Sequence, residues 1–173
     1  LAHVPDINDF VSGLKVALKP SGVITLEFPH LLNLINQNQF DTIYHEHFSY
    51  LSLFTIERIF AHHGLSIFDV QELSTHGGSL RIFAQHINGP HARQPGLESV
   101  RAKEAKAGLE TLTPYLNFSA TVDRTKRALL DFLIKAKEQG LRVAGYGAPA
   151  KGNTLLNYCG IRTDLIDFTV DIS

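Results

Sequence analysis

The chain has 173 residues, of which 44% are hydrophobic and 19% are charged, with a formal net charge of −1 at pH 7. This is the balance of a globular protein with a substantial core. Because the sequence has no basic block, binding driven by phosphate neutralisation is excluded and no nucleic-acid partner is expected. No apolar run approaches membrane-spanning length, so no membrane partner is expected either. The single cysteine, Cys159, excludes an internal disulfide and favours a reducing, cytoplasmic location.

The two ends of the sequence indicate a piece of a longer polypeptide. It contains no methionine and opens on Leu1-Ala-His-Val-Pro5, which reads as the end of a strand running into a loop. It closes after one β-α-β unit, which is too little to form a sheet alone. We therefore expect a fragment.

Helix and strand patterns alternate in the first part of the chain. Asp6 or Asn8 is predicted to cap a helix that reaches Leu18. After a turn at Pro20–Gly22, residues 23–28 form a nearly continuous apolar run, as in a strand that is covered on both faces of a parallel sheet.

A second helix and two more strands follow. Thr55 is predicted to be the N-cap of this helix and Gly64 its C-terminal stop. Strands are expected at 65–70 and 79–84, joined by a turn at His76-Gly-Gly78. Because so short a link cannot make a crossover, the two strands should be antiparallel.

Three regions are predicted. A breaker-rich stretch over 88–96 separates the strands from a helical segment that Pro114 should split in two. After Gly140, a strand over 141–147, a helix from Pro149 and a strand over 165–170 make a new β-α-β unit. The predicted domains are 1–90, 91–139 and 140–173.

The densest group of reactive side chains lies in the middle of the first region. Tyr44, His45, Glu46, His47 and Tyr50 alternate with apolar residues, so they cannot all be solvated. Because imidazole titrates near neutral pH and burial shifts its pKa, a general base in a partly buried cleft is one reading, and a polar surface loop is the other. His45 and His47 could share a face as a metal pair, but no third ligand is indicated, so no metal is expected. His3, at a strand end, lies where open α/β sheets bind ligands.

A glycine-rich turn opens the last region. Gly145-Tyr-Gly-Ala-Pro-Ala150 fits the dinucleotide pattern G-x-G-x-x-G/A, and Asp171 is near the expected acidic position. Lys151 and Thr154 could add a charge and a donor. Pro149 removes one amide from the cradle, so a turn that binds another phosphate, or a plain structural turn, remains open.

Four stretches together resemble the S-adenosylmethionine-dependent sugar C-methyltransferases, which act on nucleotide-linked ketosugars. They are Glu27-Phe-Pro-His-Leu-Leu, Phe40-Asp-Thr-Ile-Tyr-His-Glu-His-Phe-Ser-Tyr, Thr75-His-Gly-Gly-Ser-Leu-Arg and Gly145-Tyr-Gly-Ala-Pro-Ala-Lys-Gly-Asn-Thr. The resemblance runs over essentially the whole chain.

The resemblance implies a fold for each region. The first region would be the C-terminal half of a class I methyltransferase (Rossmann-like) α/β sheet, the second a helical connector, and the third the beginning of another Rossmann-like domain. The zinc-binding N-terminal domain of the family, and the loop and acid that hold S-adenosylmethionine, would lie outside this chain.

The resemblance also implies roles for individual residues. His47 would be the general base, with Tyr44, Glu46 and His3 completing the pocket. Three residues would contact the sugar nucleotide: Gly147, Lys151 and Asn153. In the implied reaction, a base-generated enolate attacks the methyl donor. The alternatives are an NAD-dependent sugar-nucleotide oxidoreductase, which rests on the glycine turn, and a non-catalytic sugar-nucleotide-binding module.

Overall fold

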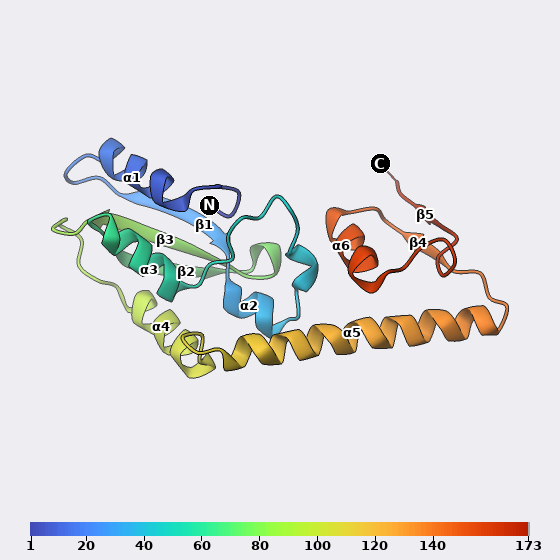
Figure 1. Cartoon of the computed structure of the whole chain (residues 1–173). Helices are drawn as coiled ribbons and strands as arrows, with labels where there is room; N and C mark the ends of the chain where they lie inside the picture. The colour runs from blue at the N-terminus through green and yellow to red at the C-terminus, as the bar shows by residue number, and fades with distance from the viewer. Residues whose placement is uncertain (173) are drawn as a thin grey trace. The chain divides into compact units, whose positions relative to one another are not determined.

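A computed structural model of the chain describes residues 1–172, which divide into two compact units (Figure 1). Unit 1 comprises residues 1–39 and 46–115, and unit 2 comprises residues 40–45 and the described residues from 116 onward. The chain thus passes between the units at 39–40, 45–46 and 115–116.

A three-stranded sheet with the order β1-β3-β2 forms the centre of unit 1. The strands are β1 (Ile24–Pro29), β2 (Leu65–Leu73) and β3 (Ser79–His86). β3 is antiparallel to both neighbours, so β1 and β2 run in the same direction but are not hydrogen-bonded to each other, as Figure 1 shows. The predicted antiparallel pairing of the last two strands is confirmed, and the closing strand lies between the other two rather than at the edge.

Helices α1 (Ile7–Ala17), α3 (Leu53–His62) and α4 (Pro95–Ala107) cover this sheet. Their apolar faces join the strands in one core, in which Phe60 of α3 and Leu97 of α4 are fully buried. The short helix α2 (Leu31–Asn36) follows β1, and a 3-10 turn, η2 (Thr75–Gly77), precedes β3. Gly78 after η2 has a φ of +112°, and a Cβ there would lie 2.2 Å from the Asn33 side chain, so glycine is required.

The observed helix ends confirm two of the predicted capping residues and correct a third. Asp6 accepts the Asn8 and Asp9 amides at the start of α1, as predicted. The prediction of Thr55 as the N-cap of α3 is wrong. The cap is Ser52, whose hydroxyl oxygen accepts the Thr55 amide at 3.1 Å, so Thr55 lies inside the helix. Gly64, with a φ of +71°, follows the end of α3 as expected.

Unit 2 is built on the long helix α5 (Thr113–Glu138), which begins in unit 1. Strands β4 (Ala144–Tyr146) and β5 (Phe168–Val170) are parallel and are connected through α6 (Ala150–Cys159), which confirms the predicted β-α-β unit with shorter strands. The 3-10 turn η1 (Phe40–Thr42) packs against α6. The helical segment breaks at Gly108, and Pro114 lies in the first turn of α5, just beyond the break.

Candidate active site

Two histidines that are distant in sequence meet in unit 1. The rings of His3 and His47 have centroids 4.8 Å apart and are nearly perpendicular, at 78°. The Tyr50 ring is 5.9 Å from that of His47, also edge to face. We call His3, His47 and Tyr50 the histidine cluster; His47 and Tyr50 are half-buried, and His3 is exposed.

Backbone hydrogen bonds hold this cluster together. The loop after η1 has no regular secondary structure, so its amides need partners elsewhere. The Ala2 carbonyl, next to His3, accepts the Phe48 amide at 2.8 Å and the Ser49 amide at 3.3 Å. Because Ala2 is 6% exposed, this acceptor is shielded from competing water. The loop that carries His47 is therefore tied to the loop that carries His3.

The other predicted residues of the central stretch are placed differently. Glu46 is exposed. Tyr44 and His45 belong to unit 2, where their ring centroids are 6.5 Å apart. The structure thus brings His3 and His47 together and adds Tyr50, a residue of the same stretch to which the sequence had given no role. A group with one exposed and one half-buried imidazole can exchange protons with a ligand and still hold a fixed geometry.

The predicted substrate-binding residues lie at the start of α6 in unit 2. Lys151 and Asn153 are exposed in or next to its first turn, which contains no acidic residue and whose N-cap, Pro149, makes no side-chain cap. Gly147 precedes them with a φ of +91°, and its amide donates to the Val170 carbonyl at 2.7 Å. The uncapped amides and Lys151 make this end of the helix favourable for an anion.

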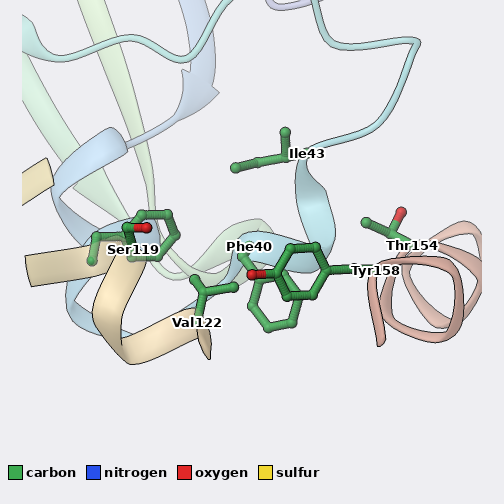
Figure 2. A pocket seen from close by; sticks show the side chains of 7 residues that line it. Phe40, Ile43, Ser119, Val122, Thr154 and Tyr158 are labelled. Atoms are coloured by element: carbon green, nitrogen blue, oxygen red, sulfur yellow. The ribbon is translucent and has the colours of Figure 1, made fainter. Parts of the chain in front are cut away.

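A cavity of about 290 Å³ lies beside the same helix within unit 2 (Figure 2). Its lining is mostly apolar and aromatic, with two hydroxyl side chains besides the tyrosine; it consists of Phe40, Ile43, Phe118, Ser119, Val122, Thr154 and Tyr158. Figure 2 shows side chains from η1, α5 and α6 gathered around it. The Phe40 and Tyr158 rings are 5.4 Å apart, and the Tyr158 hydroxyl donates to Asp123 at 2.9 Å, which raises the pKa of Tyr158.

The cavity and the start of α6 share one helix face. Lys151, Thr154 and Tyr158 are spaced by three and four residues, so their side chains follow one another along the helix. Of the cavity residues, only Thr154 was singled out from the sequence. The spacing of Thr154 and Tyr158 was the available signal, whereas the positions of Phe40 and Phe118 depend on tertiary packing.

Asp171 helps to close the glycine-rich turn. Asp171, the expected ribose ligand, accepts the Ala148 amide on Oδ2 at 2.8 Å and the Ile172 amide on Oδ1 at 2.7 Å. Both carboxylate oxygens are thus engaged in closing the turn. Within residues 1–172 there is no group of three or more potential metal ligands. No helix in that range is both long and apolar enough to cross a membrane.

Cys159 lies in the small core of unit 2 and is 4% exposed. Burial raises the pKa of its thiol, so the reactive thiolate is disfavoured at neutral pH. It is a core residue rather than part of a site.

Comparison with known proteins identifies the family. Residues 74–173 match the family described as the C-methyltransferase C-terminal domain. C-methyltransferase NovU of Streptomyces niveus is 38% identical over 170 residues, which cover 98% of this chain and 40% of that protein. The alignment with this relative therefore extends well upstream of the family match, across the region of the histidine cluster. The chain belongs to the C-methyltransferase C-terminal domain family.

Proposed function

We propose that the protein is an S-adenosylmethionine-dependent C-methyltransferase that acts on a nucleotide-linked ketosugar. The observation that carries the proposal is the meeting of His3 and His47 in a sequence of the C-methyltransferase family. S-adenosylmethionine supplies the methyl group when it is bound, and none of the described residues is assigned to it. The comparisons do not favour the oxidoreductase alternative.

His47 is proposed as the general base. A proton on the carbon next to a ketone is acidic enough for an imidazole to remove if the resulting enolate is stabilised. His3 lies edge-on to His47 and is exposed, so it can donate a hydrogen bond to the enolate oxygen beside the base. One preorganised donor of this kind is typically worth ~3 kcal/mol. Tyr44 is a second candidate donor, and Glu46 would orient the His47 ring when substrate is bound.

Unit 2 is proposed to bind the nucleotide. The diphosphate would lie against the first turn of α6, with Gly147, Lys151 and Asn153 in contact, because that turn offers uncapped amides and a cation. The nucleobase of the sugar nucleotide would enter the cavity, which lies one turn further along the helix. At about 290 Å³ the cavity is at the lower end of ligand sites, which suits one ring system rather than a whole nucleotide.

The wider organisation is part of the same proposal. Residues 1–90 would complete a class I methyltransferase sheet, residues 91–139 would connect it, and residues 140–173 would begin a Rossmann-like domain. The enzyme would work in the cytoplasm, with its zinc in a domain preceding these residues.

The test is His47→Ala in the full-length protein, followed by hydrogen–deuterium exchange at the carbon next to the ketone of the sugar substrate. Because general bases contribute about 10²–10⁴-fold, exchange and methyl transfer should both fall by that factor. His45→Ala, two residues away and exposed, is the matched control and should retain both. Undiminished exchange in His47→Ala would exclude this role for His47, and binding of the sugar nucleotide without methyl transfer by the wild type would favour a non-catalytic module.

A further inference from the structure

A carboxylate is buried where α4 meets the rest of unit 1. Glu104 is 3% exposed and lies on the same helical stripe as Leu97 and Val100, which belong to the core. An acidic residue seldom occupies such a position unless it has partners, because burial of an uncompensated charge is costly.

Glu104 has three partners, all within unit 1. Its Oε1 accepts hydrogen bonds from the Leu53 amide at 2.6 Å and from Nε2 of His30 at 2.7 Å. Its Oε2 accepts the Phe54 amide at 2.9 Å. Leu53 and Phe54 begin α3, so the carboxylate satisfies two amides that the helix itself leaves without partners, and it lies at the positive end of the helix dipole.

His30 extends this network to the loop after β1. The residue is 1% exposed, its amide donates to the Gly78 carbonyl at 3.0 Å, and the next amide, that of Leu31, donates to the Leu51 carbonyl at 3.1 Å. Nδ1 of His30 is buried and has no hydrogen-bond partner among residues 1–172. His30 therefore joins Glu104 to both the residue before β3 and the segment that ends at Leu51.

The network ends where the loop of the histidine cluster ends. Residues 47–52 lead directly into α3, and the Ala2 carbonyl holds the start of this loop through the amides of Phe48 and Ser49. Glu104 holds its other end at Leu53 and Phe54, while the Leu51 carbonyl accepts the amide of Leu31, the first residue of α2. The loop is therefore fastened on both sides of Tyr50.

We propose that Glu104, through its bond to His30, is a positioning residue for methyl transfer: it fixes the end of the loop that presents His47 to His3. The inference rests on the proposed role of His47. It assigns Glu104 no contact with substrate, since the residue acts through His30 and through the amides of Leu53 and Phe54 at the start of α3.

The test compares Glu104→Gln with Glu57→Gln in the full-length protein. The glutamine side chain can accept only one of the two amides and turns an NH₂ group towards the other. Glu57 is the matched control, because its ion pair with Arg101 joins the same two helices without touching the first turn of α3. At a temperature where circular dichroism shows both variants to be folded, kcat of Glu104→Gln should fall at least about tenfold, with KM for the sugar substrate changed less than about threefold. Glu57→Gln should retain kcat.

The pH profile of kcat separates positioning from general loosening. A displaced His47 should change the apparent pKa of the acidic limb in Glu104→Gln, where the general base becomes protonated, whereas a loss of stability alone would leave the profile unmoved below the melting temperature. Wild-type kcat and an unchanged profile in folded Glu104→Gln would overturn the proposal, as would an equal loss in Glu57→Gln.

A milder variant covers the case in which Glu104→Gln does not fold. The side-chain amide of His30→Gln can still donate a hydrogen bond to Glu104, whereas His30→Ala has no side-chain donor. We therefore expect kcat to decrease in the order wild type, His30→Gln, His30→Ala. Equal kcat in folded His30→Gln and His30→Ala would overturn the proposal. Failure of the proposed function is distinguishable, because it would show as methyl transfer retained in His47→Ala, independently of the Glu104 and His30 variants.

Discussion

The two units position their candidate sites by different physical means. In unit 1 the histidine cluster is held by hydrogen bonds to shielded backbone and a buried carboxylate, in a unit whose core includes the three strands and three helices. In unit 2 the buried core cluster consists of Leu133, Cys159 and Ile161, with partly buried neighbours. Large apolar side chains such as Phe132, Leu141 and Phe168 are exposed there. The proposed general base thus lies in the unit with the larger core, and the proposed nucleotide site lies in the unit with the smaller one.

The strongest test of this contrast is the cost of deleting one core side chain in each unit. Phe60→Ala should lower the free energy of unfolding of unit 1 by about 3–5 kcal/mol, because the ring is fully buried in a large core. Leu133→Ala should cost unit 2 about 2 kcal/mol, the lower end for such a change, because the thinner core can collapse around the gap. Hydrogen exchange by mass spectrometry, read peptide by peptide in the full-length protein, measures both. Equal loss of protection in both units from either variant would show that they unfold as one.

Removing an aromatic wall of the cavity should affect unit 2 alone. Tyr158→Ala takes away a ring that lines the cavity and contacts Phe40, so binding of uridine or thymidine diphosphate should weaken roughly tenfold, as for loss of one stacked base. Calorimetry measures the affinity. Phe132→Ala, an exposed ring on α5 outside the cavity, is the control and should bind as the wild type does. Unchanged affinity in Tyr158→Ala would show that the nucleobase does not bind in this cavity.

The smallest expected effect concerns the start of α3. Ser52→Ala should lower the free energy of unfolding of unit 1 by about 1 kcal/mol, because the hydroxyl that accepts the Thr55 amide is lost. Thr55→Ala should change it by less than about 0.5 kcal/mol, because the hydrogen bond that the Thr55 hydroxyl accepts from Ser52 is lost while alanine is the better helix former. Urea titration of the two variants gives the comparison. A larger loss of free energy of unfolding in Thr55→Ala than in Ser52→Ala would instead identify Thr55 as the N-cap.

Local chemistry explains which parts of the fold were predictable. The cap at Asp6, the stop at Gly64 and the antiparallel pairing of β2 with β3 each depend on residues close together in sequence. The start of α3 could not be predicted from nearby residues alone. Serine and threonine are both good N-caps, and the helix start is also set by Glu104, a residue about fifty positions away. The insertion of β3 between β1 and β2 is likewise a property of the assembled sheet.

The site was predictable to a similar extent. The density of titratable side chains drew attention to the stretch with His47, and the strand-end position drew attention to His3. The spacing of Leu97, Val100 and Glu104 placed a carboxylate on an apolar stripe, and this was the signal that could have revealed Glu104. The partner, His30, stands in the first of the family-like stretches, just after a predicted strand, but its burial results from contacts with separate segments of unit 1.

The acceptor role of Ala2 has a practical consequence for mutagenesis. The oxygen that fastens Phe48 and Ser49 belongs to the peptide backbone, so every side-chain substitution at position 2 retains it. A saturation scan would therefore record this position as tolerant of any small residue. Only a change to the main chain itself, such as an inserted residue that shifts the carbonyl or a recombinant boundary placed after Ala2, would reveal how much the neighbouring imidazoles depend on it.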